Sequence, residues 1–166
     1  MIEVHLSKKE VLKCERVATH RSMLSRASGV VNQRKDQSSS DIEIDLIGIK
    51  GELAVSKVYN TDFDMNELGI DSGIDMFVGD VGIDVKTTKY KTGCLLFKSV
   101  EAFKAPISIL CLNTSEDTVF VAGWIRRDDF ANRCKPFQDD GVCVQQSDLE
   151  SPESLWLNLI KLEVGK

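Results

Sequence analysis

The sequence contains few of the residues that most often mark a metal site or a secreted protein. It has two histidines, three prolines, two tyrosines and two tryptophans, and its five cysteines are scattered singly. An odd number of scattered cysteines supplies neither a disulfide framework nor the paired spacing of a zinc site, so we expect reduced, mostly buried thiols. The histidines form no metal-binding pair, and the chain has no nucleotide-binding glycine loop or Ser/His/Asp arrangement.

Long hydrophobic runs are also missing. No stretch approaches the roughly 18 apolar residues that span a bilayer, and residues 1–5 lack the apolar segment of a signal peptide. A hydrophobic content of 42% and a charged content of 28% over 166 residues are typical of one ordinary globular domain. We therefore expect a single soluble domain over residues 1–166, in the cytoplasm and without a membrane partner.

The charge is unevenly distributed along the chain. The net charge of −5 argues at first against a nucleic-acid partner. However, residues 1–35 carry +5, residues 36–85 carry −10 and residues 86–104 carry +4, so two basic blocks flank an acidic one. Concentrated carboxylates suit a divalent cation and nearby cations suit a phosphate, although solvated faces alone would give the same pattern.

Capping boxes predict the starts of two helices. Ser7 and Glu10 have the spacing of such a box, and apolar residues at helical spacing extend the helix over residues 8–26. Residues 40–43 repeat the pattern and open a second helix that ends near residue 59. Two glycines inside this second helix indicate a close approach to the sheet, because each costs up to about 1 kcal/mol relative to alanine.

The rest of the chain predicts an α/β fold. Polar residues 32–40 indicate a loop between the two helices. The predicted later elements are a strand pair within 73–88, strands at 94–97, 106–112 and 118–125, a short helix at 126–133, and a last helix from 151 to about 161. This order favours a central mixed β-sheet flanked by helices on both faces.

The strand pair within residues 73–88 carries the strongest indication of a site. Alternation directs Ile83 and Val85 to one side of the second strand, and Asp84 and Lys86 to the other. Asp75, on the preceding strand, can come alongside that polar pair. Two acids and a lysine pack poorly, but their oxygens suit Mg²⁺ and the lysine suits a water or a phosphate.

Other readings of these residues remain open. The acid and lysine of the second strand could form an exposed ion pair that adds little stability. Asp71 and Asp80, both in turn-like surroundings, are alternatives to Asp75. Glu52 could be a solvated helix residue, although its apolar neighbours and the preceding Gly51 favour the site.

Together, Gly48-x-x-Gly51-Glu52-x-Ala54, Asp75 and Asp84-x-Lys86 resemble the PD-(D/E)XK nuclease superfamily. The resemblance covers roughly residues 43–125, and Ile74 stands where the motif has proline. It implies a restriction-endonuclease-like core, similar to that of Holliday junction resolvases, and hydrolysis of DNA phosphodiesters with Mg²⁺ or Mn²⁺. The implied catalytic residues are Glu52, Asp75, Asp84 and Lys86, and the implied metal ligands are Asp75, Asp84, the Val85 carbonyl and Glu52.

Partners and substrate follow from the resemblance and from the basic blocks. The expected contacts to the DNA backbone are Lys89 and Lys91, and, on the first helix, Lys9, Lys13, Arg16 and Arg21. Tyr90 could stack on a base. Without a separate recognition domain, we expect ends, branches or nicks to be recognised rather than a long sequence. Many superfamily members are dimers, so we expect a homodimer in a bacterial, archaeal or phage-infected cell. The alternative is a non-catalytic DNA-binding module that retains the fold.

Overall fold

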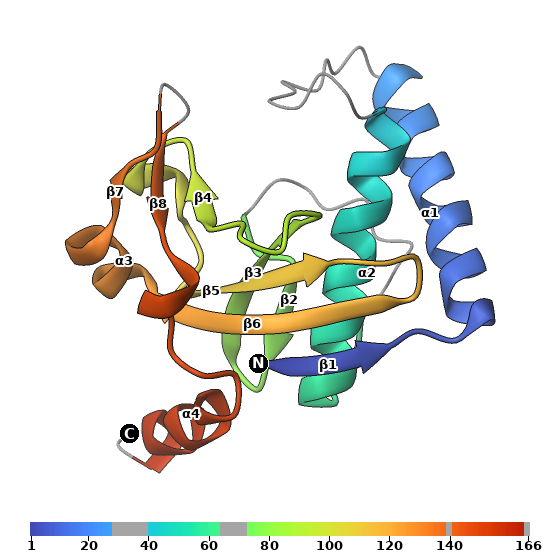
Figure 1. Cartoon of the computed structure of the whole chain (residues 1–166). Coiled ribbons are helices and arrows are strands. Elements are labelled where there is room, and N and C mark those ends of the chain that lie inside the picture. Colours follow the sequence, from blue (N-terminus) through green and yellow to red (C-terminus); the bar gives the residue numbers. More distant parts are fainter. Residues whose placement is uncertain (28–39, 64–72, 139–140, 165–166) are drawn as a thin grey trace.

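The computed structural model describes residues 1–27, 40–63, 73–138 and 141–164 (Figure 1). The predicted loop at residues 32–40 lies outside this part of the chain except for Ser40, and so does Asp71. All five cysteines are described; each is unpaired, and Cys14, Cys111 and Cys143 are buried, as predicted. No helix within the described ranges is both long and apolar enough to cross a membrane.

A five-stranded mixed sheet forms the centre of the fold. Its strand order is β1-β6-β5-β3-β2, with β3 and β5 parallel and every other neighbouring pair antiparallel. The strands are β1 (Ile2–His5), β2 (Met76–Val78), β3 (Val81–Thr88), β5 (Ile107–Asn113) and β6 (Thr118–Arg126). The predicted α/β class and mixed sheet are therefore confirmed. Strand β1 was not predicted, because it is only four residues long and pairs with the distant β6.

The helices begin where capping predicts. They are α1 (Lys8–Ala27), α2 (Asp41–Tyr59), α3 (Arg127–Arg133) and α4 (Ser154–Val164). At the start of α1 the Ser7 N–H donates to the Glu10 carboxylate at 2.7 Å, and the Glu10 N–H donates to the Ser7 hydroxyl at 3.3 Å. At the start of α2 the Glu43 N–H donates to the Ser40 hydroxyl at 3.2 Å. The last helix begins slightly later than predicted, because Pro152 lies in a turn before it. In this turn the Pro152 carbonyl accepts a hydrogen bond from the Leu155 N–H.

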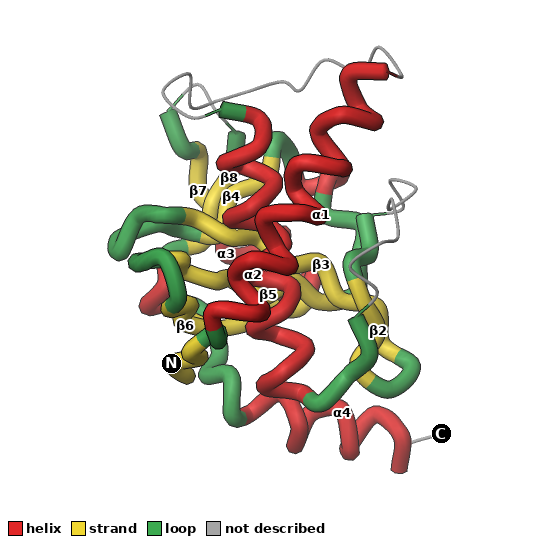
Figure 2. The backbone as a smooth tube through the Cα atoms, turned by 90° about the vertical axis from the view of Figure 1, so that its right-hand side faces the viewer, coloured by secondary structure: helices red, strands yellow, loops and turns green. Residues whose placement is uncertain are grey.

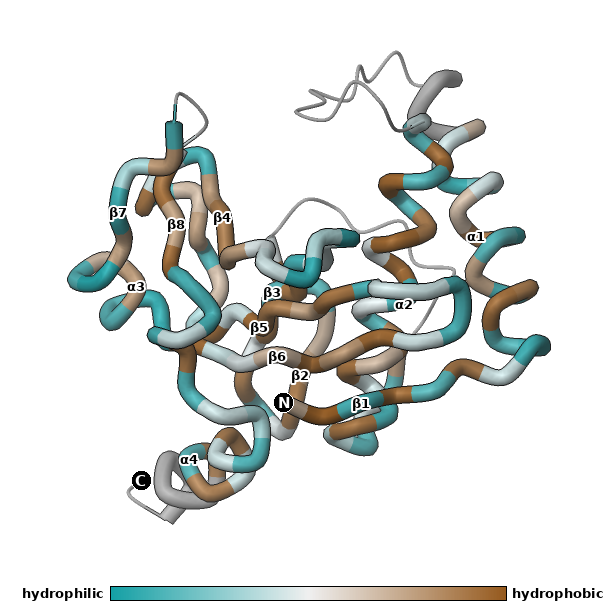
Figure 3. Tube along the Cα trace, viewed as in Figure 1, coloured by the Kyte–Doolittle hydropathy of each residue, from teal (hydrophilic) through white to brown (hydrophobic). Residues whose placement is uncertain are grey.

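Helix α2 covers one face of the sheet, as Figure 2 shows. Its Ala54, Val55 and Tyr59 are buried in one cluster with Ile83 and Val85 of β3. The C-terminal α4 adds leucines to the same cluster. Helix α1 packs on the outer side of α2, and hydrophobic and hydrophilic stretches alternate along it (Figure 3) because only its inner side is buried.

Gly51 allows α2 to approach β3 closely. A Cβ atom at this position would overlap the Thr87 side chain, whereas a Cβ at Gly48 would meet nothing within 4 Å. The predicted close approach of helix and sheet is thus confirmed at Gly51, and Gly48 does not share that role. The contact brings the next residue of the helix, Glu52, towards the end of β3.

A second, three-stranded sheet and α3 cover the other face. This sheet has the order β4-β8-β7 and consists of β4 (Leu95–Phe97), β8 (Val142–Val144) and β7 (Lys135–Pro136). Short 3₁₀ helices lie at Val100–Ala102 and Gln146–Asp148. Phe97 stacks on Phe103 with ring centroids 4.6 Å apart, and Phe130 of α3 meets both rings edge-on. The predicted strand at 94–97 is confirmed as β4, but β7 and β8 are too short to show alternation and were not predicted. The prediction of helices on both faces was therefore incomplete, because α3 shares the second face with this small sheet.

Candidate functional site

Asp75 is held against the open edge of β3. It lies directly before β2, where its N–H donates to the Ile83 carbonyl at 2.8 Å. Its Oδ2 accepts a hydrogen bond from the Val85 N–H at 2.6 Å. Because β2 pairs with β3 only as far as Ile83, the Asp75 side chain takes the place of the next residue in the ladder. Asp75 is therefore fixed beside β3, as the sequence predicts.

The Val85 carbonyl faces the same edge. The N–H and C=O of one strand residue point to the same side of the strand, and the Val85 N–H points at Asp75. The Val85 side chain is 7% exposed in the core under α2, so only its backbone is available to the site. A carbonyl oxygen and a carboxylate therefore share this edge.

Asp84 and Lys86 lie on the face of β3 opposite to α2. Asp84 is only 4% exposed, accepts a hydrogen bond from the Ser108 hydroxyl at 2.7 Å and is paired with the Lys86 ammonium. The Lys86 side chain is 41% exposed, and its Nζ lies 5.3 Å from the centroid of the Phe97 ring. Alternation thus places the pair as predicted. The alternative that Asp84 and Lys86 form an exposed ion pair is wrong in one respect, because Asp84 is buried.

Ser108 is a site residue that was not predicted from the sequence. It lies on β5 directly opposite Asp84 in the parallel register and is fully buried. The available signal was a single serine within the apolar run of residues 106–112, where a buried hydroxyl needs a partner. Only the pairing of the strands shows that this partner is Asp84.

Glu52 extends from α2 and is paired with Arg21 of α1. The side chain of Glu52 is 14% exposed, and the Arg21 Nη1 lies 3.6 Å from its Oε2. Burial and the negative charge of Asp75 raise the pKa of Glu52 to about 7, although the positive charges of Arg21 and Lys86 act in the opposite direction. Glu52 is therefore a partly buried acid that titrates near neutral pH, and the alternative of a solvated residue is wrong.

The carboxylates of the site influence one another. Asp75 is exposed as a residue, but its carboxylate is turned against β3, and this desolvation raises its pKa. The Val85 N–H opposes the rise, while the negative charge of Asp84 adds to it. Excess negative charge in a partly desolvated place is the condition that a bound cation relieves. Even so, the described residues contain no group of three or more His, Cys, Asp or Glu side chains arranged to hold a metal ion.

The structure separates the predicted DNA contacts into two sets. Lys9, Lys13 and Arg16 are exposed on α1, whereas Arg21 lies on the inner side of that helix at Glu52. Lys89 and Lys91 follow directly after β3, so they lie close to the site along the chain. Only this second set continues directly from the strand that carries Asp84 and Lys86.

Asp80, an alternative to Asp75, is exposed in the turn of the β2–β3 hairpin. It lines a different pocket, together with Arg126 and Arg127. Of the predicted site residues, the structure therefore groups Glu52, Asp75, Asp84, Val85 and Lys86 around β3. No family model, no curated protein and no solved structure matches this chain.

Proposed function

We propose that the protein is a metal-dependent nuclease of the PD-(D/E)XK type that hydrolyses phosphodiester bonds of DNA. The observation that carries the proposal is the position of Asp75, whose carboxylate is fixed to the Val85 N–H beside Asp84 and Lys86. Helix α2 brings Glu52 to the same strand. The five-stranded mixed sheet with α2 across it also supports a restriction-endonuclease-like core.

The donors present fit a hard divalent cation. Asp75, Asp84, the Val85 carbonyl and Glu52 offer only oxygen, which Mg²⁺ and Mn²⁺ prefer. Burial raises the pKa values of Asp75 and Glu52, and a cation bound beside them would favour their ionised forms. A cation bound there would supply an activated water and stabilise charge on the phosphate.

The chain's own groups then have separate tasks. Lys86 presents a half-exposed ammonium, which can stabilise negative charge on the phosphate or orient the attacking water. Glu52 has a pKa of about 7 without a cation, and a bound cation would hold it in the ionised form in which it can act as an oxygen ligand. Arg21 acts through Glu52 as a positioning residue, because its guanidinium favours the ionised carboxylate.

The direct test is cleavage of labelled single-stranded, duplex, nicked and branched DNA in Mg²⁺, Mn²⁺ and EDTA. We expect metal-dependent cleavage that Lys86→Ala abolishes and that Lys8→Ala, at an exposed lysine at the start of α1, leaves unchanged. We expect preference for ends, branches or nicks, and a homodimer in solution. Cleavage that survives in Lys86→Ala would show that another site, or another protein, is responsible.

One observation favours a second candidate, a DNA-binding module without catalysis. Asp84 is already satisfied by the Lys86 ammonium and the Ser108 hydroxyl. A site of this kind is complete without a metal ion. DNA binding without cleavage in either Mg²⁺ or Mn²⁺ would favour the module over the nuclease.

A further inference from the structure

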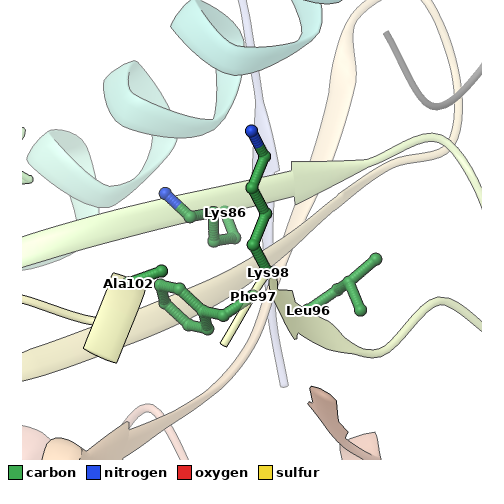
Figure 4. Close-up of a pocket in the computed structure, with 5 residues that line it drawn as sticks. All are labelled: Lys86, Leu96, Phe97, Lys98 and Ala102. Carbon is green, nitrogen blue, oxygen red and sulfur yellow. The ribbon is translucent and has the colours of Figure 1, made fainter. Parts of the chain in front are cut away.

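Lys86 lines two adjoining pockets between β3 and the second sheet. The first has a volume of about 250 Å³ and is also lined by Leu96, Phe97, Lys98 and Ala102 (Figure 4). The second has a volume of about 680 Å³ and extends from Lys86 and Leu96 to Tyr90, Phe137 and Gln138. Because Lys86 and Leu96 line both, the two pockets adjoin at the proposed catalytic lysine, and we call them together the groove. Its larger part falls within the roughly 300–1,000 Å³ of pockets that bind small ligands.

Lysines lie at both ends of this groove. Lys98 follows β4, and Figure 4 shows its side chain extending to the same side of Phe97 as that of Lys86. Lys89 and Lys91 flank Tyr90 at the other end. No acidic residue is among the described residues that line either pocket; Asp139 and Asp140, next after Gln138, lie outside the described residues. The groove therefore favours an anionic occupant.

The larger pocket also offers aromatic surface. Tyr90 lines this pocket, is 56% exposed, and has its ring centroid 5.6 Å from the Lys89 Nζ. Phe137 lines the same pocket from the β7 side. A large apolar ring beside a cation, in a groove without acids, suits a nucleobase, which has a π-face of its own.

The loop that carries Tyr90 is held in place. The Gly93 N–H donates to the Tyr90 carbonyl at 3.0 Å. The Gln146 amide donates to the carbonyls of Lys91 at 2.9 Å and Gly93 at 2.6 Å. Because these hydrogen bonds hold the loop, the Tyr90 ring loses little conformational entropy when a base stacks on it. The aromatic surface is therefore preorganised.

The opposite wall is also fixed. Gly141 has a φ of +125°, and a Cβ there would overlap the Phe97 carbonyl, so Gly141 lies directly on the end of β4. The Phe137 N–H donates to the Gly141 carbonyl at 2.8 Å. Phe137 is therefore tied to a residue that lies against β4, and Tyr90 is carried by a hydrogen-bonded loop on the other side.

We infer that this groove binds unpaired nucleotides of the substrate strand next to the scissile phosphate, with a base on Tyr90 and a backbone phosphate at Lys98. The inference rests on the proposed nuclease function and narrows its substrate to DNA with a single-stranded segment. A base can stack on Tyr90 only after leaving the duplex, where its neighbours already cover both faces. A continuous duplex therefore does not use this part of the groove.

Binding in EDTA tests the inference without cleavage. A short single-stranded oligonucleotide with 2-aminopurine at successive positions reports stacking as a change in its fluorescence. We expect the change at one position in the wild type and in Tyr90→Phe, and its loss in Tyr90→Ala, with binding weakened about five- to 150-fold. Phe77→Ala is the matched control, because Phe77 is equally exposed at 56% but lies on β2 outside the groove.

Salt dependence tests the phosphate contact. Lys98→Ala should reduce the slope of log affinity against log salt by about 0.7 for a single strand, as expected for one lost phosphate contact. Lys8→Ala should not change the slope. Blunt duplex should bind equally to the wild type and to Tyr90→Ala.

The two proposals fail in different ways. The groove inference would be overturned if Tyr90→Ala bound the single strand as tightly as the wild type does. It would also be overturned if Tyr90→Ala weakened binding of blunt duplex as much as binding of the single strand. Neither result would affect the nuclease proposal, which rests on metal-dependent cleavage. Tighter binding of an oligoribonucleotide of the same sequence would overturn the assignment of DNA. Tyr90-dependent binding without cleavage would support the groove and overturn the nuclease.

Discussion

Glu52 shows how strongly one side chain depends on its surroundings. It is a helix glutamate in a predictable place, but burial and Asp75 raise its pKa from 4.5 to about 7. Burial is the largest cause of this shift and the charge of Asp75 adds to it, while the Arg21 guanidinium, 3.6 Å away, offsets it only in part. Glu52 therefore changes its protonation state near neutral pH.

Stability should therefore fall with rising pH because of Glu52. A carboxyl group with a raised pKa binds its proton more tightly in the folded protein than in the unfolded chain. Its contribution to the free energy of unfolding is therefore fully present below about pH 4.5 and is lost as the pH rises through about 7. Between about pH 5 and about pH 8 the free energy of unfolding should fall by up to about 3 kcal/mol.

Urea unfolding at both pH values measures this fall. Glu52→Gln should remove most of the slope and should be more stable than the wild type at the higher pH. Glu15→Gln, at an exposed glutamate of α1, should leave the slope unchanged. A slope in Glu52→Gln equal to that of the wild type would assign the titration to another group.

Asp84 allows function and stability to be separated. Asp84→Asn keeps an oxygen that can accept the hydrogen bond of the Ser108 hydroxyl. It removes the negative charge that pairs with Lys86, but the Lys86 side chain is 41% exposed and its ammonium can be solvated. We expect the metal-free protein to lose less than about 2 kcal/mol while Mn²⁺ affinity falls at least about tenfold. Calorimetric titration with Mn²⁺ and urea unfolding measure the two effects.

Asp80→Asn is the control for this experiment, because Asp80 lies exposed in the hairpin turn. It should change neither Mn²⁺ binding nor stability. A loss of more than about 2 kcal/mol in Asp84→Asn, with Mn²⁺ binding retained, would identify Asp84 as a structural residue.

Among the elements, the contact of α2 with β3 decides where Glu52 lies. Gly51 provides that contact against Thr87, and three atoms of the Thr87 side chain lie within reach of an added Cβ. Threonine is branched at Cβ and cannot move aside by a simple rotation. The position of the helix on the sheet is consequently sensitive to one methyl group.

Two alanine substitutions in α2 should have opposite effects. Gly48→Ala meets no neighbour and should stabilise the protein by up to about 1 kcal/mol through helix propensity. Gly51→Ala should destabilise it by about 1–3 kcal/mol, because the helix must move away from Thr87. Thermal unfolding of both variants measures the difference, and stabilisation by Gly51→Ala would show that helix and sheet separate without cost.

For the whole molecule, the site joins parts of the chain that are far apart in sequence. Glu52 belongs to α2, Asp75 and Asp84 to the β2–β3 hairpin, and Ser108 to β5. An ion that binds this site in the folded protein alone stabilises the entire fold through mass action.

Mn²⁺ at about one hundred times its dissociation constant should raise the free energy of unfolding by about 2.7 kcal/mol. EDTA should reverse the increase. Asp84→Asn, with an affinity at least about tenfold lower, should gain about 1.4 kcal/mol or less at the same Mn²⁺ concentration. Urea unfolding with and without Mn²⁺ gives the value. An equal increase in the wild type and Asp84→Asn would place the ion elsewhere.

The sequence by itself determined the features that local chemistry controls. Capping boxes located the starts of α1 and α2, and alternation placed Asp84 and Lys86 on the side of β3 opposite to Val85. These features depend on neighbours within a few residues, so a local pattern is sufficient to predict them.

Only the tertiary structure decided the partners. The Asp84–Ser108 hydrogen bond joins residues 24 positions apart, and the pairing of Arg21 with Glu52 depends on how α1 packs on α2. The second sheet, and with it the groove beside Lys86, forms from strands of two and three residues. No local pattern encodes such contacts, because they depend on which distant surfaces bury each other, and the pKa of Glu52 follows from that burial.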